Sequence, residues 1–219
     1  VNMEQLSPPL TVAALKTPRA AAVAGILFAL LYGATVILIR ISVPEDLAAE
    51  SVWLATNGGR VALALNMAPF AGIAFLWFIG VIRDRIGDLE DRFFSTVFFG
   101  SGLLFLALSF AGAALAGGLM TAYAIQPTAI LESGTYTYGR AVMYGVLNTY
   151  AIRMAGVFMI SLATISLRTG VISRAWALIT YALALVLLLS ISYTLWVTLI
   201  LPAWVLGLSV VFLITEKRS

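Results

Sequence analysis

Two arginines lie in one long apolar stretch, residues 136–167, where their chemistry is unusual. Arg140 is near its start and Arg153 near its middle. A charged side chain at membrane depth costs at least about 2.5–3.5 kcal/mol, so it is by default a candidate functional group. A guanidinium pairs well with carboxylates and phosphates. The stretch therefore predicts a pocket for an anionic group.

The neighbours of these arginines extend the candidate site. At 100° per residue, Thr149 shares a helical face with Arg153, and Asn148 lies on a ridge with Arg140. No apolar stretch contains an acid, so protein partners of Arg153 must be neutral acceptors. The predicted binding residues for an anion or an anionic lipid are Arg153, Arg140, Arg60, Asn66, Asn148 and Thr149. A structural alternative stays open, in which Arg153 reaches the membrane interface or bonds to helix carbonyls.

Other chemistry is poorly supported by the composition. The chain has no cysteine and no histidine, which removes disulfides, most zinc sites and histidine-dependent triads. Its acids lie in loops or at the ends of apolar stretches, and both lysines lie near the termini. We predict no catalytic residue, no metal and no cofactor. An enzyme would need Glu50 or Glu132 to meet a second catalytic group.

The composition identifies a membrane protein. Of 219 residues, 62% are hydrophobic and 11% charged, and the mean hydropathy is +1.03. Several continuous apolar stretches reach the roughly 20 residues that span a bilayer, which favours helices over barrel strands. We predict an all-α bundle of six transmembrane helices in a single domain, 20–215, between a tail, 1–19, and a short end, 216–219. The predicted spans are about 20–39, 60–82, 93–120, 136–167, 175–189 and 195–214.

A seventh, shorter helix is expected outside the membrane. Ser42, Pro44 and Glu45 fit a capping box with proline in the first turn. The stretch 43–56 mixes Trp53 and Leu54 with acids, as in helices that lie on a membrane surface. We therefore predict an interfacial helix over 43–56.

Small residues recur every four positions on three of the predicted spans. Such ridges let helices approach closely. They are Ala21, Gly25, Ala29 and Gly33, then Ala64, Ala68 and Gly72, and then Ser109, Ala113 and Gly117. The simplest interpretation is packing within the bundle. A homo-oligomer, or docking to a larger membrane complex, is the alternative.

The basic residues predict the orientation. Six spans place both termini on one side, which then holds nine of the lysines and arginines, against three on the other side (Arg40, Arg60 and Arg140). The positive-inside rule puts both termini in the cytoplasm. Basic residues scattered singly at span ends do not form a nucleic-acid surface, so we expect no such partner.

Part of the chain resembles a known family. The segment 68–80, the charged turn 83–92 and the pair Phe93-Phe94 resemble an uncharacterised bacterial family of six-span integral membrane proteins. The resemblance implies a multi-pass protein of the bacterial inner (plasma) membrane and attaches no activity.

Two functions follow as hypotheses. The first is a transporter or channel, not an enzyme, with an outward-facing vestibule around Arg153 that takes an anionic lipid or a small anion. The second is an accessory or scaffolding subunit that packs into a larger membrane complex through its small-residue ridges. A continuous polar path would favour the first hypothesis, and a small-residue face turned to lipid would favour the second.

Overall fold

The fold is helical throughout the described chain. A computed structural model describes residues 17–46, 51–86, 92–169, 173–189 and 195–216, and within these ranges no strand occurs. The longer helices are α1 (Thr17–Ser42), α3 (Gly58–Ile86), α4 (Arg92–Ile125), α7 (Ile152–Thr169), α8 (Arg174–Leu189) and α9 (Ile200–Glu216). The shorter ones are α2 (Val52–Thr56), α5 (Pro127–Glu132), α6 (Thr135–Gly145), the π-helical turn η2 (Val146–Ala151) and the 3-10 turn η3 (Leu195–Leu199).

The apolar helices make this an all-helical membrane protein, as predicted. In the described chain, five stretches are long and apolar enough to cross a bilayer: Ala20–Ser42, Gly58–Arg83, Phe93–Ile125, Thr135–Arg168 and Trp196–Ile214. The remaining predicted span, 175–189, corresponds to α8, which has only 16 residues. Such a helix is about 24 Å long, less than the roughly 30 Å hydrocarbon core. The six-span bundle is therefore not confirmed.

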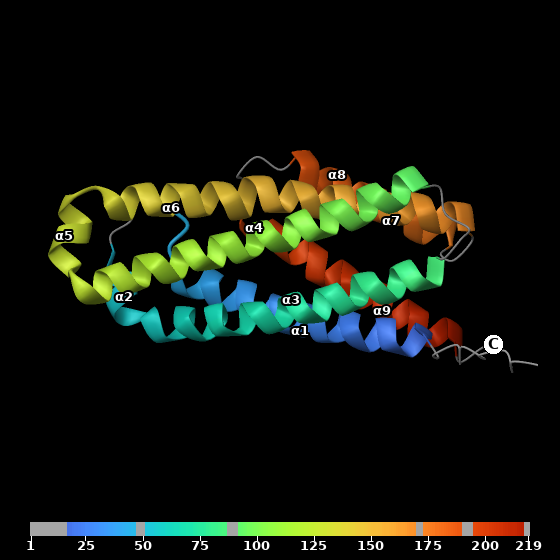
Figure 1. The fold of residues 1–219 in the computed structure, drawn as a ribbon, viewed down its shortest axis with the longest axis horizontal. Coiled ribbons are helices and arrows are strands. Elements are labelled where there is room, and N and C mark those ends of the chain that lie inside the picture. Colours follow the sequence, from blue (N-terminus) through green and yellow to red (C-terminus); the bar gives the residue numbers. More distant parts are fainter. Residues whose placement is uncertain (1–16, 47–50, 87–91, 170–172, 190–194, 217–219) are drawn as a thin grey trace, which may run out of the picture.

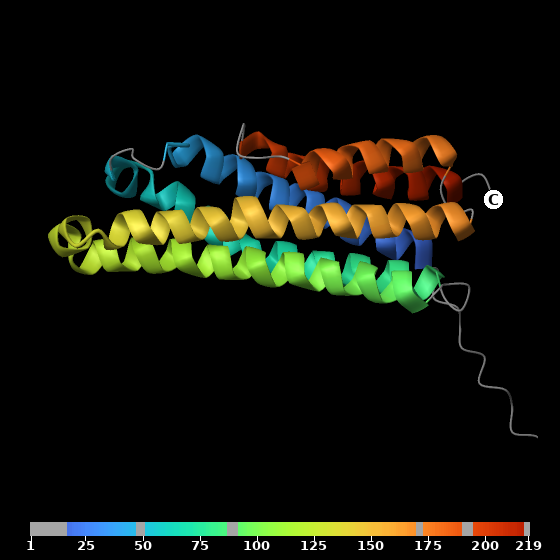
Figure 2. The same cartoon turned by 90° about the horizontal axis from the view of Figure 1, so that it is seen from above.

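The helices pack in two groups. α1 contacts α3 and α9, while α4 contacts α6, η2 and α7, and α7 contacts α8. Figure 1 shows α4 running obliquely between the two groups, with α5 and α2 at one end of the molecule. We call this the α5 end. In Figure 2, α6, η2 and α7 form one continuous rod beside α4, and both rods extend to α5.

Aromatic side chains pack together in the half of the bundle that lies away from the α5 end. Phe75 is fully buried, and its ring lies 4.6 Å from that of Phe28 and 5.2 Å from that of Phe158, centroid to centroid. Phe98 stacks on Phe158 at 4.9 Å, and Trp204 meets Phe158 edge-on. Aromatic pairs at such distances add to the stabilisation that burial supplies. This part of the bundle is a densely packed apolar core.

The small-residue ridge of α1 packs inside the bundle. A Cβ at Gly25 would overlap Ser209 on α9 and lie 2.9 Å from Phe78 on α3. Ala21 and Ala29 on the same ridge are also buried. The close approach that the spacing predicts therefore occurs between helices of this chain, although a Cβ at Gly33 would meet nothing within 4 Å.

The predicted interfacial helix over 43–56 is wrong at its start. Residues 43–46 are not helical, 47–50 lie outside the described residues, and the helix in this region, α2, begins only at Val52. The reason is that Ser42 continues α1 instead of capping a new helix, and the amide of Val43 still donates to the carbonyl of Ile39. In α2, Trp53 and Leu54 are buried against Tyr136 and its neighbours.

Candidate binding site

Arg40 is a charged residue that the fold brings into the bundle at the α5 end. It lies near the end of α1 and is half-buried. Its Nη2 donates to Oδ1 of Asn148 over 2.7 Å, and its buried Nε has no acceptor among the described residues. A guanidinium has five N–H donors. This guanidinium therefore keeps donor capacity that the described part of the chain does not use.

The π-helical turn places Asn148 opposite Arg40. η2 lies between α6 and α7, and its wider turn changes which side chains face α1. Nδ2 of Asn148 donates to the carbonyl of Tyr144 over 3.2 Å, so the amide oxygen is turned to Arg40. Such single π turns within α-helices are frequent at functional sites.

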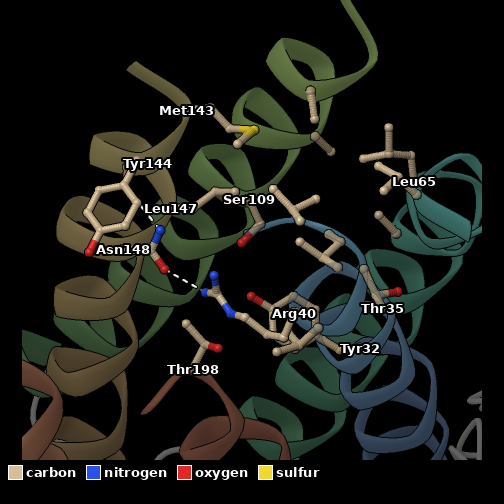
Figure 3. A pocket seen from close by; sticks show the side chains of 18 of the residues that line it. Tyr32, Thr35, Arg40, Leu65, Ser109, Met143, Tyr144, Leu147, Asn148 and Thr198 are labelled. Carbon is tan, nitrogen blue, oxygen red and sulfur yellow. Dashed lines mark hydrogen bonds between the residues drawn. The ribbon is translucent and has the colours of Figure 1, made fainter. Parts of the chain in front are cut away.

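A cavity of about 100 Å³ opens beside this pair, between the two groups of helices. On α1 its wall runs from Phe28 to Arg40, which is about 18 Å along a helix. Most of the lining is apolar, and the polar side chains gather at the Arg40 end of the cavity. Figure 3 shows Tyr32, Ser109, Tyr144, Asn148 and Thr198 around Arg40, whereas Thr35 lies farther away and donates to the carbonyls of Leu31 and Ala64.

Small residues on α3 and α4 help to form the cavity. Ala68 and Gly72 line it from α3, and Ser109 and Ala113 line it from α4. These four belong to the ridges that predict close helix packing. Gly72 is also in such a contact, since a Cβ there would overlap Phe110. Ala68, Ser109 and Ala113 have small side chains that leave space at the cavity wall.

Arg140 holds the chain segment at the mouth of the cavity. It is 2% exposed, and it donates from Nη2 to the carbonyl of Pro44 over 2.8 Å and from Nη1 to that of Asp46 over 3.1 Å. Nη1 also lies 3.3 Å from the hydroxyl of Tyr136, which accepts a 2.8 Å bond from Nε1 of Trp53. We call these five residues the Arg140 clamp. It ties residues 44–46 and α2 to α6.

Of the predicted site residues, only Arg140 and Asn148 line the cavity. Arg153 is half-buried, and its Nη1 donates to the carbonyl of Thr149, one turn earlier on the same helix, over 2.9 Å. That partner is a neutral acceptor, as the sequence requires. Arg60 and Asn66 are exposed, and neither lines the cavity. The structure thus separates the six residues into two that share the cavity and four that do not.

Sequence reasoning missed Arg40 because it stands at the end of an apolar stretch, where arginines are ordinary. One signal was available. Arg40 is one of three basic residues on the sparsely charged side, and no acid precedes it within its span. Glu45 is the acid in the cavity wall, but its side chain is exposed, and no ion pair joins it to Arg40 in the part of the chain that the structure describes.

The arrangement suits binding more than bond making. The cavity offers a guanidinium, an amide and several hydroxyls, and the rest of its lining is mostly apolar. Comparison of the chain with protein-family models, with curated proteins and with solved structures found no match. The resemblance of segment 68–80 to a bacterial membrane family therefore stays a prediction, and the function is argued from the cavity.

Proposed function

We propose that this protein binds an amphipathic anion in the cavity beside Arg40 and carries it as a transporter. The observation that supports this is the guanidinium of Arg40, whose one hydrogen bond within the described chain goes to a neutral amide. A partly buried charge is costly unless an opposite charge or further acceptors satisfy it. A bound anion supplies both.

The orientation of the chain makes the proposed site outward-facing. The count of basic residues favours termini in the cytoplasm of a bacterial inner membrane, which puts the α5 end outside. The cavity then lies in the outer half, while the aromatic core around Phe75 and Phe158 closes the inner half. A site closed on one side and reached from the other fits the outward-facing state of a transporter better than an open channel.

We centre the proposed site on Arg40 and Asn148 instead of Arg153. The bond from Arg153 to the carbonyl of Thr149 fits the structural alternative for that residue, and Arg153 does not line the cavity. Arg140 contributes at the mouth by positioning residues 44–46. Arg60, Asn66 and Thr149 have no part in this proposal.

The accessory-subunit hypothesis has less support. It draws on small-residue ridges that turn toward lipid, but Gly25 is covered by Ser209 and Phe78, and Gly72 by Phe110. Ala68 and Ala113 on the other ridges face the cavity. The ridges are thus mostly used within the bundle, which favours the binding role.

The proposal is tested by the molecules that stay bound during gentle purification. Native mass spectrometry of the intact chain is expected to detect an anionic amphiphile that is lost in Arg40→Gln. Arg153→Gln is the matched control and is expected to retain it, because Arg153 lies outside the cavity wall. An unchanged ligand in Arg40→Gln, or its loss in Arg153→Gln alone, would refute the assignment.

A further inference from the structure

We infer that the cavity takes a short-chain monocarboxylate, of the size of acetate or propionate. This inference rests on the proposed binding function and narrows it, because such an acid is among the smallest anions that also carry an apolar part. It follows from three properties of the described cavity: its volume, the charges in its wall and the donors that Arg40 offers.

The volume of the cavity sets the size of the ligand. An engineered cavity of roughly 150 Å³ holds benzene, which has six non-hydrogen atoms. At the same packing, the volume of about 100 Å³ holds about four such atoms. Acetate has four non-hydrogen atoms and propionate has five, whereas octanoate has ten. The cavity therefore admits a very short acid and excludes a chain of lipid length.

Aromatic side chains close the cavity on the Tyr32 side. The ring of Tyr32 lies 5.2 Å from that of Phe28 and 5.6 Å from that of Phe105, centroid to centroid. Rings at such distances are in contact and leave no room for an acyl chain between them. All three residues line the cavity. A tail that starts at Arg40 therefore cannot pass between these rings, which also favours a short ligand.

The charges in the wall favour one negative charge on the ligand. Arg40 and Arg140 are cations and Glu45 is an anion, so the charged residues of the lining leave one positive charge. The bonds of Arg140 to the carbonyls of Pro44 and Asp46 fix its position but do not neutralise it. A monoanion balances this lining. The second charge of a dianion would lie against a mostly apolar wall without a partner, which is costly.

Arg40 supplies the donors that a carboxylate needs. Its two Nη atoms carry four N–H groups, and within the described chain one of them is used, in the bond to Asn148. The other N–H groups suit the two oxygens of a carboxylate. The bond to Asn148 holds the guanidinium in place before a ligand arrives, and Figure 3 shows Asn148 and Ser109 next to it. A halide ion would use these donors but not the apolar wall, so the lining favours a carboxylate with a carbon tail.

The first test is a chain-length series with the full wild-type protein in detergent. Radiolabelled propionate is displaced by unlabelled acetate, propionate, butyrate, hexanoate and octanoate. We expect acetate and propionate to bind best, with dissociation constants that are micromolar at the tightest for so few atoms. Octanoate is expected to compete at least about 10-fold less well, because it overfills the cavity. Partition into detergent gives the opposite order, since each added CH₂ favours an apolar phase.

Two further competitors and two variants test the head group. Propionamide has the shape of propionate without its charge and is expected to bind about 10- to 100-fold more weakly. Inorganic phosphate, which is partly a dianion at neutral pH, is expected to compete less well than propionate. Arg40→Gln is expected to weaken propionate by the same factor as the loss of the ligand's charge. Arg153→Gln is the control and is expected to leave propionate binding unchanged, because Arg153 does not line the cavity.

An enlarged cavity gives a result that a folding defect cannot imitate. Leu106 is buried on α4 and lines the cavity. Leu106→Ala removes three carbon atoms from the wall and is expected to shift the best ligand from propionate to a longer acid, such as pentanoate or hexanoate. Leu104→Ala, at an exposed position on the same helix outside the cavity lining, is the matched control and is expected to keep the order of the wild type.

The outcomes separate this inference from the proposed function. Octanoate as the best ligand of the wild type, or tighter binding of phosphate than of propionate, overturns the short-chain carboxylate. If Arg40→Gln weakens that other ligand, the anion site at Arg40 stands. Binding of no carboxylate and no phosphate, or equal binding by Arg40→Gln and the wild type, overturns both proposals. The competition series needs no variant, so a folding defect in Arg40→Gln does not protect the inference.

Discussion

The Arg140 clamp gives the sharpest prediction about the α5 end. Arg140→Met keeps the length and apolar stem of the side chain but removes the donors to the carbonyls of Pro44 and Asp46. Hydrogen bonds to a charged group contribute about 1.5–3 kcal/mol each. Both carbonyls belong to exposed residues and regain water after the substitution, so we expect a combined local loss of about 2–4 kcal/mol.

Hydrogen exchange measures this loss directly. The amide of Asn57 donates to the carbonyl of Trp53 in α2, which the clamp holds against Tyr136. A loss of 2–4 kcal/mol corresponds to exchange faster by about 30- to 700-fold at such amides, where local opening controls the rate. Arg60→Met removes an exposed arginine at the same end and is the control, with no change expected. Unchanged exchange of α2 in Arg140→Met would show that the clamp does not hold this segment.

Three further predictions concern packing and orientation. Gly25→Ala is expected to lower the free energy of unfolding by about 1–3 kcal/mol, because the new Cβ would overlap Ser209. Gly33→Ala places its Cβ in open space and is expected to raise the free energy of unfolding by about 0.5–1 kcal/mol. Equal effects of the two substitutions in thermal unfolding would contradict the close approach of α1 and α9. Trp204→Phe removes the 2.9 Å bond from Nε1 to Oγ1 of Thr180 and is expected to lower the free energy of unfolding by about 1 kcal/mol, while Trp77→Phe, at an exposed position, is expected to leave the unfolding midpoint unchanged. The chain has no cysteine, so single cysteines can report the orientation of each loop. A thiol reagent that does not cross membranes is expected to label Thr128→Cys in intact bacterial cells, and Ser173→Cys only after the membrane is permeabilised. The reverse labelling pattern would show that the proposed orientation is inverted.

Hydropathy alone predicted most of the membrane-embedded fold. The stretch Thr135–Arg168 differs from the predicted span 136–167 by one residue at each end, and Gly58–Arg83 differs from 60–82 by one or two. Such limits follow from the length of the hydrocarbon core, which depends on composition more than on neighbours. The predicted stretch 175–189 also matches α8 within one residue, but at 16 residues α8 is not confirmed as a span. The prediction failed at the start of α2, because Ser42 continues α1 and residues 43–46 are not helical.

The candidate site was harder to predict because depth in a span does not say which way a side chain faces. Arg153 lies deeper along its span than Arg40, yet its guanidinium bonds to its own helix at Thr149. Arg40 lies near a span end but turns inward, because the π turn η2 presents Asn148 across the gap. A single π turn has no clear sequence signature, so the pairing of these two residues could not be read from spacing.

One spacing pattern led to two different structures, and the difference shows how the cavity forms. Small residues every four positions indicate only that one face of a helix carries small side chains. At Gly25 the side chains of Ser209 and Phe78 fill that face, and the helices lie in close contact. Ala68 and Ala113 instead line the cavity, where their small side chains leave space. The same pattern therefore stabilises one half of the bundle and leaves room for a ligand in the other.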